Sequence, residues 1–212
     1  MLVNCVVYRE GTKLADIAVD SISDHLGQPD TFVWVALRDP SQQELEQMQD
    51  EFNLHDLAVE DALKGHQRPK IEEYGDTLFV AMHLVEYSPT DELVVGEVHV
   101  FAGSNFVLSV SKRSTQGFLG VRQRCEREPE LLGLGAGFVL YALMDAVVDR
   151  YFPMVDALDT ELETVEERIF ERGTGRSNIE RLYELKRRVT TLRHAVAPLL
   201  DASSRLHGGR VP

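Results

Sequence analysis

The chain has 212 residues, of which 43% are hydrophobic, so it is long enough for one large globular domain or two small ones. Its formal net charge of −13 argues against binding to the phosphate backbone of nucleic acids and favours cations or basic partners, although an acidic surface also serves solubility alone. Only two cysteines are present, Cys5 and Cys125, which indicates a reducing compartment and no disulfide framework.

The first fifty residues alternate strands with short helices. A Val-rich segment and the segment after it predict a hairpin, a continuous β-branched and aromatic run predicts a buried strand, and a capping box begins a helix. The expected elements are strands at 2–8, 13–19 and 31–37, a short helix from Asp20 to about Gly27, and a helix capped by Ser41 and Glu44 that runs to about Phe52.

The segment 55–74 combines more unlike features than any other part of the chain. It begins as a short amphipathic helix that carries the adjacent carboxylates Glu60 and Asp61. Pro69, in the polar run that follows, disfavours helical geometry at the residue before it, so the helix ends earlier. The apolar positions that recur at helical spacing are Leu57, Ala58, Ala62 and Leu63.

Three strands and a helix are predicted next. Turn residues separate segments at 77–87, 92–101 and 106–111, which predicts an antiparallel meander, and residues 115–128 are expected to be helical. Strands flanked by helices in this arrangement predict an α/β fold, with a mixed β-sheet sandwiched by helices over residues 1–132.

The last third, residues 133–212, predicts a long antiparallel helical hairpin. Apolar residues recur at alternating steps of three and four, first over 141–169 and then over 182–199. Pro153 and Pro198 are expected to kink these helices. We expect the seam residues to be buried by contacts within each protomer. They are Tyr141, Met144, Val148, Tyr151, Val155, Leu158, Leu162, Val165 and Ile169, then Leu182, Leu185, Val189, Leu192, Val196 and Leu199.

Enzyme signatures are absent from the sequence. It has no phosphate-binding Gly loop, no Gly-x-Ser-x-Gly, no His-Glu-x-x-His and no Cys-x-x-Cys, and no two histidines are four residues apart. No signal peptide is apparent, and the longest apolar run, 133–148, is interrupted by Asp145 and is too short to span a membrane. The sequence therefore predicts a soluble polypeptide that is not an enzyme.

Three carboxylates, Glu60, Asp61 and Asp145, are the candidate metal ligands. Glu60 and Asp61 point about 100° apart on their helix, so they suit neighbouring ions, or one ion completed by another chain. Asp145 lies beside the heptad seam on an otherwise apolar stretch, where a carboxylate needs a partner or a metal. Such oxygen ligands suit a hard ion such as Mg²⁺. The structural alternative is a salt bridge to Arg68 or Lys70, or a helix cap.

The polar run Gln67–Lys70 also has two interpretations. It can form a structural turn in which Arg68 clamps a carboxylate or the C-terminus of a helix, or it can bind an anion. We favour the structural turn.

Several segments resemble the cytoplasmic domain of the CorA family of magnesium and cobalt transporters. The most specific is 55–74, which has a similar His-x-Leu-x-x-Glu-Asp pattern followed by Gln-Arg-Pro-Lys-x-x-x-Tyr. The others are 32–40, 141–152, 185–187 and 197–199. The Gly-Met-Asn pore motif, the membrane helices and the stalk helix of that family have no counterpart here, so we interpret the chain as a truncated soluble fragment of a longer membrane protein.

The resemblance implies an α/β sandwich with a helical hairpin beside it and a homopentamer in the full-length protein. It implies that Glu60, Asp61 and Asp145 bind Mg²⁺, or Co²⁺ or Zn²⁺, between neighbouring cytoplasmic domains, and that loss of these ions opens a channel. It places the domain on the cytoplasmic side of the inner membrane, in contact with the membrane only through the missing helices, and implies no nucleic-acid partner.

The leading interpretation is a regulatory, cation-sensing domain of a Mg²⁺/Co²⁺ channel. Two alternatives stay open. One is the cytoplasmic domain of a related zinc transporter, and the other is a soluble scaffold that uses the hairpin as an interaction surface and has no metal role.

Overall fold

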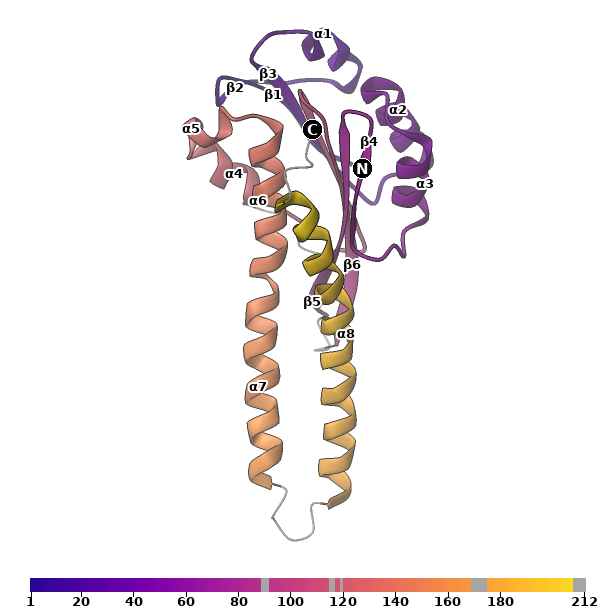
Figure 1. The fold of residues 1–212 in the computed structure, drawn as a ribbon, viewed down its shortest axis with the longest axis vertical. Coiled ribbons are helices and arrows are strands. Elements are labelled where there is room, and N and C mark those ends of the chain that lie inside the picture. Colours follow the sequence, from indigo (N-terminus) through magenta and orange to yellow (C-terminus); the bar gives the residue numbers. More distant parts are fainter. Residues whose placement is uncertain (89–91, 115–116, 119, 169–174, 208–212) are drawn as a thin grey trace.

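The computed structural model describes residues 1–88, 92–114, 117–118, 120–168 and 175–207. Its centre is a seven-stranded sheet in the order β2-β1-β3-β7-β6-β5-β4 (Figure 1). β3 and β7 run parallel and the other neighbouring pairs are antiparallel, so the predicted mixed sheet is confirmed. The strands are β1 (Leu2–Arg9), β2 (Thr12–Asp16), β3 (Thr31–Arg38), β4 (Lys70–Tyr74), β5 (Thr77–Tyr87), β6 (Leu93–Ala102) and β7 (Phe106–Lys112).

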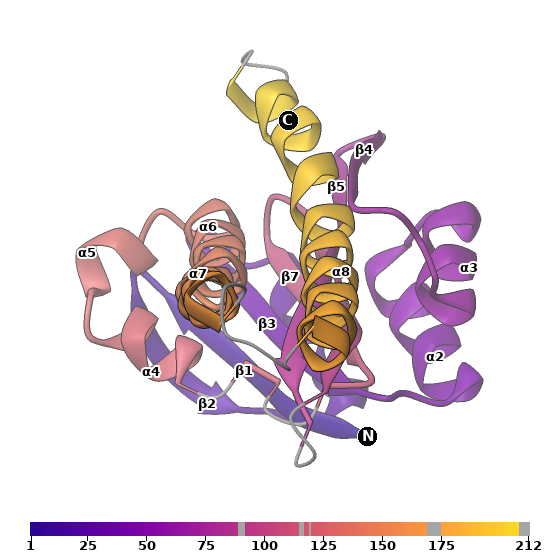
Figure 2. The ribbon, with the colours of Figure 1, turned by 90° about the horizontal axis from the view of Figure 1, so that it is seen from below.

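Helices cover both faces of this sheet, which separates two hydrophobic clusters (Figure 2). Along β3, Val33 and Val35 point into one cluster, while Phe32 and Trp34 point into the other. The first face is covered by α1 (Ser23–Leu26), α2 (Gln42–Phe52) and α3 (Asp56–Lys64), and the second by α4 (Val121–Glu126), α5 (Pro129–Leu132), α6 (Ala136–Asp149) and α8 (Gly175–His207). Both hydrogen bonds of the predicted capping box at Ser41 and Glu44 are present.

The predicted helix at 115–128 is much shorter in the structure, where only 121–126 form α4. Gly117 and Gly120 have φ angles of 53° and 87°, and this left-handed backbone cannot continue a right-handed helix. Residues 115, 116 and 119 lie outside the described part of the chain.

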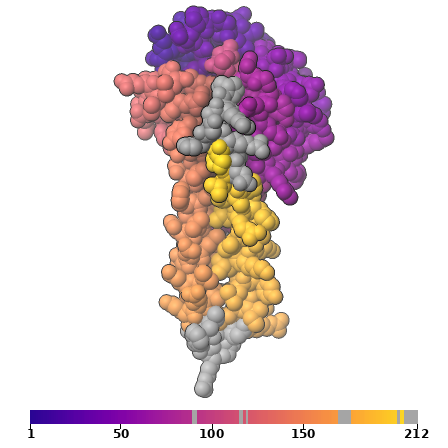
Figure 3. All heavy atoms as spheres, in the orientation of Figure 1, coloured from indigo at the N-terminus to yellow at the C-terminus, as the bar shows by residue number. Residues whose placement is uncertain are grey.

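The hairpin is built from α6, α7 (Tyr151–Arg168) and α8, and Figure 3 shows α7 (orange) and α8 (yellow) packed side by side. The first long helix is interrupted at the single residue Arg150, whose backbone dihedral angles stay in the right-handed helical region. Pro153 has no N–H to donate to the carbonyl of Asp149, so the helical hydrogen bonds stop there. Pro198 lies inside α8 without ending it. No helix among the described residues is long and apolar enough to cross a membrane.

The heptad seam is only half buried, so the prediction that its residues are buried by contacts within each protomer is wrong. One row of the heptad is in the core, at Tyr151, Leu158, Val165, Leu185 and Leu192. The other row is exposed, at Tyr141, Val148, Val155, Leu162, Leu182, Val189 and Val196. Ile169 lies outside the described residues.

The exposed row follows the buried row by four residues on both helices, as Val155 follows Tyr151 and Val189 follows Leu185. Equal offsets on antiparallel helices place the two exposed rows on the same side of the hairpin. An apolar row at one of the two seam positions that stays exposed is typical of a helix that packs against a further partner as well. The hairpin therefore presents an apolar face that it does not cover itself.

Truncation of a side chain should affect the free energy of unfolding strongly in the buried row and weakly in the exposed row. Leu185→Ala should lower the free energy of unfolding by about 2–5 kcal/mol, because it removes buried methyl groups and leaves a cavity. Val189→Ala should change the free energy of unfolding by no more than about 0.5 kcal/mol, because Val189 is exposed. Urea unfolding followed by circular dichroism measures both, and equal losses would mean that the second row is covered in solution.

Candidate metal-binding site

The helix that carries the Glu-Asp pair is fixed at both ends. His55 is its N-cap, and its Nδ1 accepts a hydrogen bond from the N–H of Leu57 at 3.2 Å, while its ring stacks on Tyr74 with centroids 4.4 Å apart. Ala58 and Ala62 pack against the sheet, as predicted. Leu57 is 55% exposed, so its expected place in the core is wrong.

Glu60 and Asp61 each have a basic partner within the chain. Glu60 pairs with Lys64 one turn along α3. The Asp61 carboxylate lies 2.7 Å from Nζ of Lys70, which also contacts Glu72 at 2.6 Å. Burial acts to lower the pKa of Lys70, but hydrogen bonds to the two carboxylates outweigh it and raise that pKa overall. The structural alternative, in which Lys70 neutralises an acid of α3, is what this conformation contains.

Asp145 is also neutralised, but by a residue that the sequence analysis did not single out. Its carboxylate lies 2.6 Å from Nη2 of Arg124 on α4, and the hydrogen bond raises the pKa of Arg124. The expected partners Arg68 and Lys70 are wrong for Asp145, because α6 packs on the sheet face opposite to α3.

The candidate ligands therefore do not come together within one chain. Glu60 and Asp61 lie on α3 over one face of the sheet, and Asp145 lies on α6 over the other (Figure 2). Among the described residues, no group of three or more His, Cys, Asp or Glu side chains is placed to hold a metal ion.

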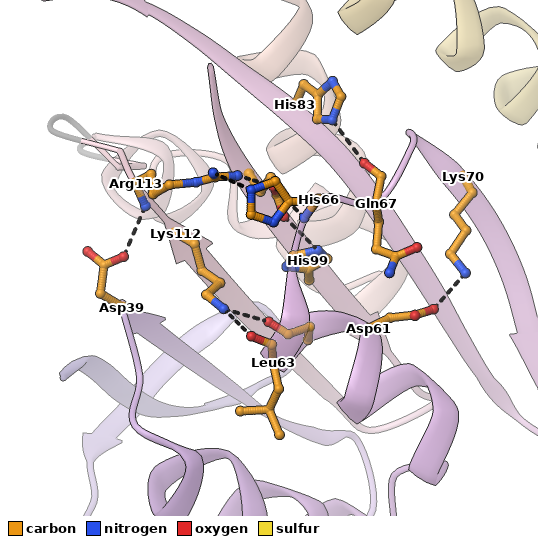
Figure 4. Close-up of polar contacts among 12 residues, drawn as sticks. Asp39, Asp61, Leu63, His66, Gln67, Lys70, His83, His99, Lys112 and Arg113 are labelled. Atoms are coloured by element: carbon orange, nitrogen blue, oxygen red, sulfur yellow. Dashed lines mark hydrogen bonds and ion pairs between the residues drawn. The ribbon is translucent and has the colours of Figure 1, made fainter. Parts of the chain in front are cut away.

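The polar run after α3 is held in place by the sheet, and Arg68 has no part in this. Arg68 is exposed and forms no hydrogen bond or ion pair with another described residue, so its expected clamp is wrong. Lys112 of β7 caps the helix instead, because its Nζ donates to the carbonyls of Ala62 and Leu63 at 3.2 and 2.5 Å (Figure 4). His83 Nε2 lies 2.9 Å from the carbonyl oxygen of Gln67.

A buried carboxylate, Glu97 of β6, completes this anchoring. Its Oε1 accepts the backbone N–H of His66 at 2.7 Å and pairs with the guanidinium of Arg113. Gly65 has a φ of 64°, and a Cβ at Gly65 would lie 2.9 Å from Glu97 Oε2, so a glycine is needed there. The sequence signal for this anchor is an acid at a core position of a strand otherwise rich in Val, and the sequence analysis missed it.

His99 lies beside Glu97 and is 1% exposed. Its Nε2 is 3.6 Å from Glu97 Oε2, and its ring is parallel to that of Phe79 at 5.9 Å. Burial lowers the pKa of His99 to about 4, so the ring is neutral at pH 7. The loop between α3 and β4 is thus tied to strands in the middle of the sheet.

Comparison with known proteins identifies the family. The profile of the family described as CorA-like Mg²⁺ transporter protein matches residues 29–210. The chain belongs to this family. The resemblance inferred from the segment 55–74 is therefore confirmed.

The relatives are longer than this chain. It is 30% identical over 184 residues to YfjQ of Bacillus subtilis, which carries the name of a metal ion transporter, and 32% identical over 158 residues to the cobalt/magnesium transport protein CorA of Thermotoga maritima. The alignments cover 86% and 74% of this chain but 56% and 45% of the relatives, so the chain spans about half of their length.

A solved structure confirms the fold. The soluble domain of CorA from Methanocaldococcus jannaschii superposes with a TM-score of 0.73 at 16% identity, over 97% of this chain and 80% of that one. The α/β sheet with a long helical hairpin is therefore the fold that the sequence predicted.

The buried histidine predicts a dependence of stability on acidity. The unfolded chain takes up a proton at His99 below about pH 6.5, whereas the folded chain resists it until about pH 4. Stability should therefore fall as the pH drops through this window, by up to about 3 kcal/mol from His99 alone. Urea unfolding of wild type and His99→Leu across the window measures the difference.

The control is His194→Gln on α8, an exposed position, which should keep the wild-type pH dependence. An unchanged pH dependence in His99→Leu would contradict the assignment to His99.

The anchoring of the loop predicts which residue of the polar run matters. Glu97→Gln should lower the free energy of unfolding by about 1.5–3 kcal/mol, because it weakens charge-assisted hydrogen bonds to His66 and Arg113 in a buried place. Arg68→Ala should change the free energy of unfolding by no more than about 0.5 kcal/mol. Chemical unfolding compares them, and a larger loss for Arg68→Ala would reverse the assignment.

Proposed function

We propose that this chain is the regulatory, cation-sensing part of a CorA-type Mg²⁺/Co²⁺ channel, located on the cytoplasmic side of the membrane and without enzymatic activity. Membership of the family supports transport of divalent cations by the full-length protein, and one relative is named for cobalt and magnesium. The surplus of 35 acidic over 22 basic residues is compatible with cations as partners.

One observation carries the mechanism. Asp61 and Asp145 lie over opposite faces of the sheet, and each forms an ion pair with a basic residue of the same chain. Both carboxylates are partly exposed, with 22% and 33% of the side-chain surface accessible. Mg²⁺ binds through one or two carboxylates and keeps several waters. We propose that the ion replaces Lys70 and Arg124 as the partner of these carboxylates and is shared between two chains.

This arrangement also supports the type of assembly. An ion shared by Asp61 of one chain and Asp145 of the next joins unlike faces, which is a heterologous contact. Such contacts close into a ring when the rotation between neighbours permits. The homopentamer implied for the full-length protein is such a ring, and the exposed apolar row of the hairpin offers further surface for burial in an assembly.

In this proposal, gating follows from competition between the Mg²⁺ ion and the basic side chains of Lys70 and Arg124 for the two carboxylates. When the ion is bound, it links neighbouring chains and neutralises the two carboxylates in place of Lys70 and Arg124. When the ion is lost, Lys70 and Arg124 recapture Asp61 and Asp145 within each chain, and the link disappears. We propose that this release permits the movement that opens the channel, so that a high Mg²⁺ concentration keeps it closed.

The experiment is a set of melting curves in MgCl₂ and in NaCl of matched ionic strength, which removes general screening. If the dissociation constant is about 1 mM, about 10 mM Mg²⁺ should raise the free energy of unfolding of wild type by about 1.4 kcal/mol. For a chain of this length, that is a rise of about 3–6 °C in the melting temperature. Asp61→Asn and Asp145→Asn should each abolish the Mg²⁺-specific part, because the amide removes the charge on which a hard cation depends.

The matched control is Asp156→Asn, an exposed aspartate on α7, which should respond to Mg²⁺ as wild type does. Without metal, each site variant should lose about 0–1 kcal/mol, because each loses a partly exposed ion pair. Equal Mg²⁺ shifts in wild type and all variants would contradict the proposed site and favour a scaffold without a metal role.

A further inference from the structure

A cavity of about 60 Å³ lies under α4, on the face of the sheet opposite to α3. Trp34, Ala36 and Arg38 alternate along β3 and so present their side chains to this face. The small Ala36, with Ser109 and Ser111 across on β7, leaves space between the two large side chains. A cavity needs only about 10–15 Å³ to hold a water, so this one has room for a larger ion.

Two buried donors at this cavity have no hydrogen-bond partner among the described residues. They are Nε1 of Trp34, a residue that is 2% exposed, and Nε of Arg38. Both side chains line the cavity, and both can only donate hydrogen bonds. Buried polar groups in native proteins are almost always satisfied, so two unpartnered donors at one cavity indicate a bound species that accepts hydrogen bonds.

The lining favours an anion over water. No Asp or Glu lines the cavity, whereas Arg38 does. A second arginine of the lining, Arg122, already pairs with Glu126 at 3.1 Å. Arg38 forms no ion pair with a described residue, and an anion would neutralise its charge, whereas a water would leave that charge unpaired. The hydroxyls of Ser109 and Ser111 donate to the carbonyls of Val35 and Leu37 at 3.3 Å, so the donors left for a bound species are those of Trp34 and Arg38.

The backbone above the cavity is built around the Arg38 guanidinium. Gly117 has a φ of 53°, and a Cβ at this position would lie 2.7 Å from Arg38 Nη2. A larger residue would therefore displace the guanidinium. The overall charge of −13 opposes anions at long range, but salt at about 0.1 M screens exposed charges beyond about 10 Å, so the lining decides.

We propose that this cavity binds a small inorganic anion of the size of chloride, held by the indole N–H of Trp34 and the guanidinium of Arg38. Trp34 is the only tryptophan of the chain, so its fluorescence reports directly on the site. Bromide, a chloride analogue that quenches indole fluorescence, should quench Trp34 in a saturable way in mixtures with sodium gluconate at constant ionic strength. Added chloride should relieve the quenching. Quenching that rises linearly with bromide and ignores chloride would mean that the cavity holds only water.

Variants test the two donors separately. Arg38→Met should raise the bromide concentration for half-maximal quenching by at least about tenfold, because it removes a charged donor. Arg127→Met, an exposed arginine at the end of α4, should leave it unchanged. Trp34→Phe provides a readout without fluorescence: wild type should melt at a higher temperature in chloride than in gluconate, and this variant should lose most of the difference. An equal difference in both proteins would overturn the proposal.

Discussion

The seven-stranded sheet stands between the carboxylates of α3 and the carboxylate of α6, and the rest of the account depends on this separation. No single ion can reach Asp61 and Asp145 of one chain through a layer of close-packed side chains. Each acid is instead neutralised locally, by Lys70 and by Arg124. A cation that uses both acids has to lie between two chains, and a contact of this kind joins unlike faces.

The same sheet gives the proposed site a connection to the interior. Lys70 is the first residue of β4, so its ion pair with Asp61 ties α3 directly to the edge of the sheet. Lys112 and Glu97 hold the end of α3 and the following loop against β6 and β7. Exchange of Lys70 for a metal ion at Asp61 therefore alters a contact within a rigid network. We propose that this exchange couples ion binding to the position of α3.

Sequence reasoning succeeded where a local rule decides the structure. The capping box at Ser41 and Glu44 and the turn-bounded strands of the meander are examples. It failed where distant residues decide. Periodicity identified both rows of the heptad but not which one the sheet would cover, and the left-handed backbone at Gly117 and Gly120 delays the start of a helix that propensity alone would begin earlier. The partner of Asp145 could not be predicted, because Arg124 meets it only once α4 packs against α6. Glu97 acts through His66, 31 residues away, so no local pattern points to it.

The most direct test of a site shared between chains is complementation by mixing. Wild type should sediment faster with Mg²⁺ than with NaCl of matched ionic strength, and neither Asp61→Asn nor Asp145→Asn alone should do so. In an equimolar mixture, Asp145 of one variant can meet Asp61 of the other and rebuild one intact contact. We expect Mg²⁺-dependent complexes in the mixture alone among the variant samples. A mixture that sediments as the average of its two components, beside a wild type that responds, would contradict a site shared between chains.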